Sequence, residues 1–188
     1  MRPPPDALAL AGVAVLASVL ATACVGPETT MPGCEPGGRL GILAQAVPTA
    51  SQVPCIKEMP VGWNFESLDV DSGRARFWLD SDRAGLRAAE VELSSTCDIR
   101  GATRVAAEEE TTERYQRLTA LSPRFVGATY DVFEGGCVTY RYELVNGPHI
   151  VLYQELHDAV SLFPRQALAD DVRADLGLDL DPKDGRRR

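Results

Sequence analysis

Alternation of apolar and polar residues dominates the middle of the chain. Between residues 74 and 80, Ala75, Phe77 and Leu79 fall on one face of an extended segment, and charged residues fall mainly on the other. Residues 88–94 alternate in the same way. A period of two is typical of strands with one buried face. We therefore predict two amphipathic strands in this region.

Other segments have the composition of strands without such strict alternation. They are residues 63–70, 113–121, 126–133 and 137–145. Glu134-Gly135-Gly136 joins the last two and is typical of a hairpin, whereas the polar residues 100–112 predict a loop. The chain thus predicts an antiparallel, meander-like sheet of about five or six strands.

The hydrophobic period changes after residue 145. Apolar residues then recur at helical spacing: Ile150, Tyr153, Leu156, Val160 and Phe163. Asn146 is a candidate N-cap of this helix, Pro164 is expected to open a second helix, and Gly177 is expected to end it. We expect both C-terminal helices to pack on one face of the sheet, which gives an α+β fold.

The region before the sheet is rich in proline and glycine. Residues 24–39 predict a flexible tether, and residues 40–47 predict a short helix. Prolines 48, 54 and 60 are expected to hold the next segment extended. One globular domain is predicted over residues 40–180, followed by a disordered tail at 181–188.

The first 24 residues have the features of an export signal. Arg2 precedes an apolar run over residues 7–20, which is followed by small residues. This order is typical of a signal peptide, here residues 1–23. The apolar run is shorter than the roughly 20 residues that span a bilayer.

The end of this segment, Ala21-Thr22-Ala23-Cys24, resembles the lipobox of bacterial lipoproteins. The resemblance implies that the chain is cut before Cys24 and that the Cys24 sulfur receives a diacylglycerol. The protein would then be held by lipid at the outer face of the cell membrane. Two alternatives stay open, namely an ordinary cleaved signal that yields a secreted protein and an uncleaved N-terminal anchor helix over residues 7–25.

Four cysteines remain after Cys24 is assigned to lipid. An even number of cysteines in an exported chain favours two disulfides, for which three pairings exist. We favour Cys34–Cys55, which would tie the proline-rich arm to the domain, and Cys97–Cys137, which would join a strand end to a hairpin. A zinc site is the weaker alternative, because the chain contains no Cys-x-x-Cys pair.

Charge and motifs restrict the function classes. The net charge of −8 argues against binding to nucleic acid. The sequence lacks a Gly-x-Ser-x-Gly elbow, a His-Glu-x-x-His helix and a phosphate-binding glycine loop. We therefore predict no metal and no cofactor, and an enzyme is the less favoured class.

Two histidines are the weak catalytic candidates. His149 and His157 lie eight residues apart on the first predicted C-terminal helix, about 80° around its axis. They would line one side of a cleft, where Glu155 or Asp158 could orient a general base. The alternative is that both histidines are ordinary residues at the edge of the core.

Trp78 is a candidate for partner recognition. It falls on the polar face of its strand, close to Arg74 and Arg76. An exposed tryptophan beside arginines is suited to binding a protein or a glycan. The alternative is that a helix or the N-terminal arm covers Trp78.

These observations favour a non-enzymatic, extracytoplasmic binding domain on a cell-envelope lipoprotein. Its expected partners are the membrane, through the N-terminal lipid, and an envelope protein or wall polymer, through the sheet face that the helices leave open. The alternative function is that of a hydrolase-like enzyme that uses His149 or His157 with a carboxylate.

Overall fold

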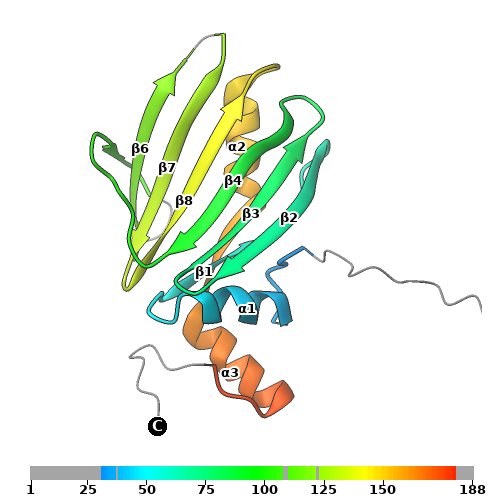
Figure 1. Cartoon of the computed structure of the whole chain (residues 1–188), viewed down its shortest axis with the longest axis vertical. Helices are drawn as coiled ribbons and strands as arrows, with labels where there is room; N and C mark the ends of the chain where they lie inside the picture. Colours follow the sequence, from blue (N-terminus) through cyan, green and yellow to red (C-terminus); the bar gives the residue numbers. More distant parts are fainter. Residues whose placement is uncertain (1–30, 37, 108–109, 122, 181–188) are drawn as a thin grey trace, which may run out of the picture.

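The computed structural model describes residues 31–36, 38–107, 110–121 and 123–180. Cys24, the predicted signal peptide and the predicted tail lie outside these residues. The described residues form a seven-stranded antiparallel sheet, a two-stranded antiparallel sheet and three helices (Figure 1). The fold is therefore α+β, as predicted.

The elements follow one another in a simple order. They are α1 (Gly38–Ala46), β1 (Gln52–Ile56), β2 (Trp63–Asp71), β3 (Arg74–Ser81), β4 (Gly85–Ser94), β5 (Thr103–Val105), β6 (Glu113–Ala120), β7 (Phe125–Phe133), β8 (Gly136–Leu144), α2 (His149–Ala159), β9 (Val160–Pro164) and α3 (Arg165–Leu176).

The large sheet consists of two meanders that meet in its middle. Its strand order is β2-β3-β4-β8-β7-β6-β5, so β4 pairs with β8 rather than with β5. Val91 of β4 lies opposite Tyr140 of β8. The prediction of five or six strands was too low, because β5 forms within the segment expected to be a loop. Its three residues are all exposed, so no alternation in burial marks them.

The small sheet was missed for a different reason. β1 and β9 pair antiparallel, with Pro54 opposite Leu162. Pro54 lacks an N–H, but in a two-stranded sheet every strand is an edge and tolerates proline. The buried backbone of β1 needs hydrogen-bond partners, and β9 supplies them. The helix predicted to continue through Phe163 therefore stops at Ala159.

The helix ends were predicted unevenly. Pro148 occupies the N-cap position of α2 without a side-chain cap, so the assignment of Asn146 as N-cap was wrong. Gly177 ends α3 in the left-handed conformation, with φ of 64°, and its N–H donates to the carbonyl of Arg173. This confirms the predicted end, because glycine adopts a positive φ without steric cost.

One C-terminal helix, not two, covers the large sheet. α2 lies across one face of the sheet, whereas α3 lies beside α1 at one end of the molecule (Figure 1). Leu152 and Leu156 of α2 are fully buried in the same core as Phe77 and Val91. α3 contacts β9 and α1 instead, because β9 carries the chain away from the covered face before α3 begins. The opposite face of the large sheet carries no helix in the described part of the chain.

Two disulfides link segments that are distant in the sequence. Cys34 bonds to Cys55 and Cys97 bonds to Cys137, with Cα–Cα distances of 4.9 and 6.1 Å. Both predicted pairs are confirmed. Residues 33 and 34, which fall in the predicted tether, also contact β1: Gly33 forms a bridge with Ile56, and the Cys34 N–H donates to the Ile56 carbonyl.

Disulfides of this kind persist in oxidising compartments, so they indicate an extracytoplasmic domain. Within the described ranges, none of the helices combines the length and the apolar character needed to cross a membrane.

Candidate functional site

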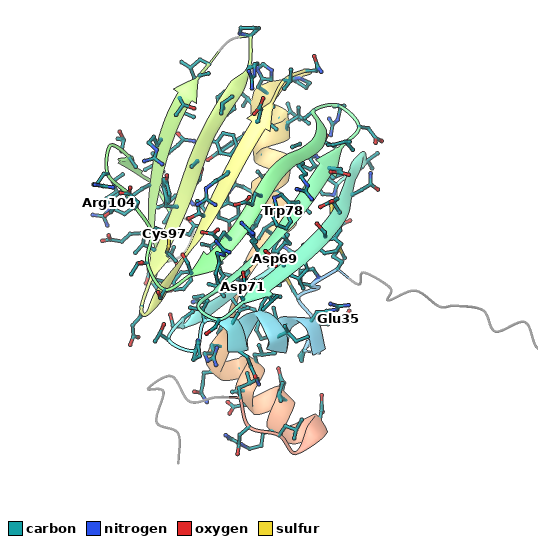
Figure 2. The ribbon with its side chains drawn as sticks, in the orientation of Figure 1. Glu35, Asp69, Asp71, Trp78, Cys97 and Arg104 are labelled. Carbon is teal, nitrogen blue, oxygen red and sulfur yellow. A yellow bond between two sulfur atoms is a disulfide. The ribbon has the colours of Figure 1, made fainter. Side chains whose placement is uncertain are left out.

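The uncovered face of the sheet, here called the open face, presents Trp78 (Figure 2). Trp78 is half-buried, and the guanidinium groups of Arg76 and Arg87 lie over its ring, at 5.0 and 4.9 Å from its centroid. Its Nε1 donates a 3.0 Å hydrogen bond to Glu90. Among the described residues no helix covers this ring, and part of the N-terminal arm of the expected alternative lies outside them. Two arginine side chains contact the ring.

Arg87 reaches Trp78 through an unusual backbone conformation. Its φ is 48°, in the left-handed region that non-glycine residues rarely adopt. Its N–H donates a 2.7 Å hydrogen bond to the carboxylate of Asp80, and its guanidinium forms an ion pair with Glu66 at 3.1 Å. Strain of this kind costs on the order of 1–3 kcal/mol and persists only where the surroundings hold it. Here the Asp80 hydrogen bond and the Glu66 ion pair hold Arg87 in this conformation, beside the irregularity in the β3–β4 pairing.

The two arginines predicted to accompany Trp78 behave differently. Arg76 contacts the ring and forms an ion pair with Asp69 at 2.7 Å. Arg74 forms its ion pair with Asp71, at the β2–β3 turn. Sequence reasoning missed Arg87, because alternation does not reveal a residue with positive φ.

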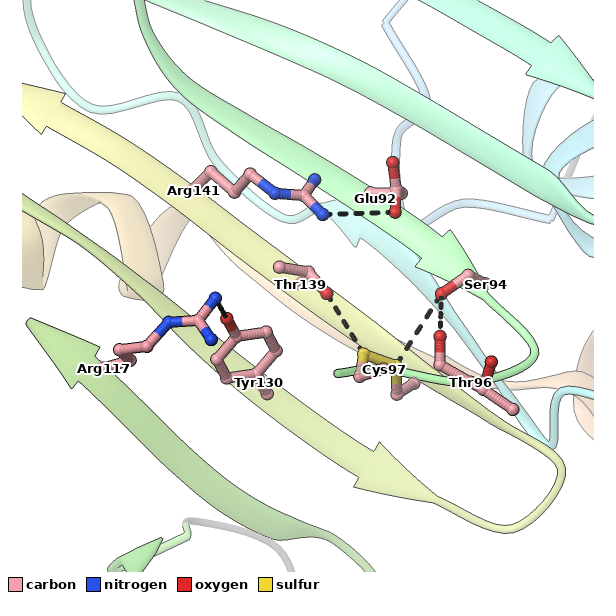
Figure 3. The surroundings of a disulfide bond; sticks show 9 residues. Glu92, Ser94, Thr96, Cys97, Arg117, Tyr130, Thr139 and Arg141 are labelled. Atoms are coloured by element: carbon pink, nitrogen blue, oxygen red, sulfur yellow. Dashed lines mark hydrogen bonds and ion pairs between the residues drawn. A yellow bond between two sulfur atoms is a disulfide. The ribbon is translucent and has the colours of Figure 1, made fainter. Parts of the chain in front are cut away.

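A groove of about 370 Å³ runs beside Trp78 along the open face. Among the residues that line it are Trp78, Arg87, Glu90, Arg117 and Arg141. Arg141 pairs with Glu90 and, at 3.4 Å, with Glu92, and Arg117 lies over the Tyr130 ring (Figure 3). The groove thus combines planar guanidinium groups, carboxylates and an aromatic edge.

A second site, here called the inner pocket, lies on the covered face. It is a cavity of about 240 Å³ between β6, β7, β8, the end of α2 and β9. Within it, Arg114 of β6 forms a two-point ion pair with Asp131 of β7, at 2.6 and 2.9 Å. The Asp131 side chain has no exposure, and that of Arg114 is 17% exposed. Thr112 and His157 also line this cavity.

His157 is held by aromatic rings rather than by a carboxylate. Its ring centroid lies 4.7 Å from that of Tyr140 and 4.5 Å from that of Tyr153. Both of its ring nitrogens are buried and lack a hydrogen-bond partner among the described residues. Burial, together with the charge of Arg114, lowers the pKa of His157 to about 4, while the charge of Asp131 partly opposes the shift. His157 is therefore neutral at physiological pH.

The two histidines do not share a cleft, contrary to prediction. His149 stacks on Phe125, with 6.1 Å between ring centroids, and lines an apolar groove with Leu121 and Ile150. Glu155, a predicted partner of a histidine, accepts hydrogen bonds from Trp63 and Arg83 instead. Within the part of the chain that the structure describes, neither histidine forms the His–carboxylate pair that a general base of the predicted kind needs.

The described residues contain no group of three or more His, Cys, Asp or Glu side chains arranged to hold a metal ion. Comparisons with protein-family models, with curated proteins and with solved structures find no match.

Proposed function

We propose that the chain is a lipid-anchored protein of the bacterial cell envelope whose domain binds another envelope component through its open face. The lipobox-like end of the N-terminal segment supports the anchor at Cys24. The two disulfides support an extracytoplasmic location. The partner is an envelope protein or a wall polymer.

The observation that carries this proposal is the arrangement of Arg76, Trp78 and Arg87. Tryptophan and arginine are the residue types most enriched at binding hot spots. Here the tryptophan is held in place by two cation–π contacts and one hydrogen bond before any partner arrives. Ordering the side chains in advance lowers the entropy cost of binding.

The ion pairs around the groove allow partner exchange. The side chains of Asp69 and Arg141 are 41% and 49% exposed. Exposed pairs contribute only about 0–1 kcal/mol, so a guanidinium can leave one carboxylate for another at low cost. Arginine binds planar carboxylate and phosphate groups through two parallel hydrogen bonds. A partner with such groups beside a flat, stackable surface fits the groove.

Co-sedimentation of the processed chain with cell-wall material from its native host tests the open face. We expect Trp78→Ala and Arg87→Ala each to weaken binding about tenfold or more, as hot-spot truncation does. Arg104→Ala is the matched control, because Arg104 is exposed on β5 at the edge of the same sheet. Equal binding by all variants would exclude a wall polymer on this face, and crosslinking in cells from position 78 would then test an envelope protein.

Membrane partition and intact mass test the anchor separately. We expect wild type to carry lipid on Cys24 and to sediment with membranes, and Cys24→Ala to be released or left unprocessed. A wild-type chain without lipid would overturn the anchor but not the binding role of the open face.

A further inference from the structure

The polar lining of the inner pocket is unexpected on its face of the sheet. Elsewhere this face is packed with apolar side chains such as Phe77, Leu79 and Val91, which have no exposure. At β6 and β7 the same face carries Arg114 and Asp131, in cross-strand register. A buried ion pair of this kind is seldom better for stability than apolar residues of similar size. A gain in folding stability therefore does not explain why charged residues occupy these two positions.

Two further side chains in this pocket have unmet hydrogen-bonding groups. The Thr112 hydroxyl is buried without a partner among the described residues, and so are both ring nitrogens of His157. Thr112 as a whole is 7% exposed. Leaving a buried polar group unpaired costs about 1–3 kcal/mol, and natural structures rarely accept that cost without a reason. Three such atoms among the lining side chains of one cavity indicate that a molecule completes the site.

The charges in the pocket restrict what that molecule is. Arg114 and Asp131 neutralise each other at hydrogen-bonding distance. Lys57 and Asp158, also lining residues, are exposed and opposite in sign. The described side chains that line the site therefore carry no net charge to attract an anion or a cation.

The unmet groups restrict the ligand further. A neutral imidazole presents one donor and one acceptor, and a threonine hydroxyl presents both. Hydroxyl groups satisfy such mixed sites, because each one donates and accepts. The cavity volume of about 240 Å³ equals that of roughly eight water molecules, below the usual range for drug-sized ligands.

We infer that the inner pocket binds a small, neutral, hydroxyl-rich molecule, a polyol or single sugar unit, between Thr112, His157 and the Arg114–Asp131 pair. This site is separate from the open face, from which it differs in size, exposure and charge. The inference does not depend on the proposed partner of the open face.

Nitrogen-15 NMR of the imidazole side chains tests this binding on the full processed chain. The probes are glucose, N-acetylglucosamine and myo-inositol, with acetate and inorganic phosphate as anionic comparisons. We expect at least one neutral probe to shift the His157 signals in a saturable way. His149 is the internal control, because it lies in another groove on the same helix.

Two variants make the test specific. Thr112→Val keeps the shape of the side chain and removes its hydroxyl, so we expect it to weaken binding of that probe about tenfold, the loss of one to two hydrogen bonds. Thr119→Val is the matched control, since the Thr119 hydroxyl is exposed and bonded to the Val126 carbonyl. Both variants are first checked for native folding by their amide spectra.

Each outcome has a definite meaning. Saturable shifts of His157 that weaken in Thr112→Val, and not in Thr119→Val, support the inference. Shifts caused by the anions alone overturn the ligand class. No saturable shift with any probe, together with ordered water detected at the His157 nitrogens, overturns the site and identifies the cavity as a water-filled one.

Discussion

Each face of the large sheet carries an ion pair between an arginine and an aspartate, but the two pairs differ in their exposure to solvent. On the open face, Arg76 and Asp69 form an ion pair in which both side chains keep substantial exposure, 29% and 41%. On the covered face, Arg114 and Asp131 form a pair whose carboxylate has no exposure at all. Arg76 donates from two nitrogens to one oxygen of Asp69, whereas Arg114 donates to both oxygens of Asp131. The pairs therefore differ in geometry as well as in exposure to solvent.

That difference changes what each pair indicates. Water already solvates the open-face charges, so their pairing adds little stability and leaves them able to exchange partners. On the covered face the carboxylate has lost its water, and the largely buried Arg114 compensates its charge. An arginine of the open face can therefore exchange its carboxylate for a group of a binding partner. The buried pair of the covered face cannot do so at low cost, and its presence needs an explanation from the fold or from a ligand.

Removal of one carboxylate from each pair gives the largest contrast. We expect Asp131→Ala to lower the free energy of unfolding by about 3–5 kcal/mol, because it removes the two-point ion pair to the largely buried Arg114. We expect Asp69→Ala to lower it by less than about 1 kcal/mol. Urea denaturation of both variants measures the difference. Equal effects would show that burial does not distinguish the two pairs.

The Cys97–Cys137 disulfide stabilises the large sheet by a covalent link rather than by an ion pair. It ties the segment after β4 to the start of β8, and the Cys97 sulfur contacts the Thr139 hydroxyl (Figure 3). The disulfide closes a loop whose ends are 40 residues apart, so we expect Cys97→Ala to destabilise the domain by roughly 3–4 kcal/mol. Thermal unfolding without reductant measures the loss.

Reductant provides the control for this prediction. Reductant opens the Cys34–Cys55 bond in both proteins and the Cys97–Cys137 bond in wild type. With reductant added, wild type and Cys97→Ala should therefore approach the same melting temperature. An unchanged melting temperature of Cys97→Ala without reductant would refute a structural role for this disulfide.

The pH dependence of stability tests the covered face directly. His157 has a pKa of about 4 in the folded state against an ordinary value of 6.5. The unfolded chain therefore binds the proton more readily, and folding stability falls as the pH drops from 6.5 to 4. This loss of folding stability reaches about 3 kcal/mol. It is absent above pH 6.5 and stays constant below pH 4.

A comparison of variants isolates this contribution. The difference in unfolding free energy between wild type and His157→Phe should shift by about that amount between pH 7 and pH 4. A parallel profile for wild type and His157→Phe would show that His157 is accessible to solvent.

Sequence patterns predicted the elements whose burial alternates. β3 and β4 were found because Phe77 and Leu79 point to the core while Trp78 points away. β5 and β9 were missed, since a short exposed strand and a strand that continues a helical spacing give no period of two. These two strands form because β6 and β1 lie beside them in the folded chain, and a local sequence pattern does not show which strands will pair.

The candidate sites were likewise predicted only in part from the sequence. Trp78 was recognised because a large aromatic residue stood on a polar face, but Arg87 needed a positive φ that no pattern reveals. His157 was noted as a candidate, whereas Arg114 and Asp131 were missed. One signal was present: the two opposite charges occupy inward positions of adjacent strands, and the hairpin register brings them together.

The smallest expected effect on stability belongs to the residue with the largest expected effect on binding. Trp78 is half-buried and its contacts are with charged, solvated groups. We expect Trp78→Ala to cost on the order of 1 kcal/mol of stability, since cation–π contacts at exposed sites contribute about 0.5–1 kcal/mol each and the freed arginines regain water. Trp63→Ala is the comparison, because Trp63 is 3% exposed and bonded to Glu155. Truncation of a buried tryptophan costs about 3–5 kcal/mol. If denaturation showed equal losses for the two tryptophans, Trp78 would be a structural residue of the sheet, and the open face would lose the feature that makes it a binding surface.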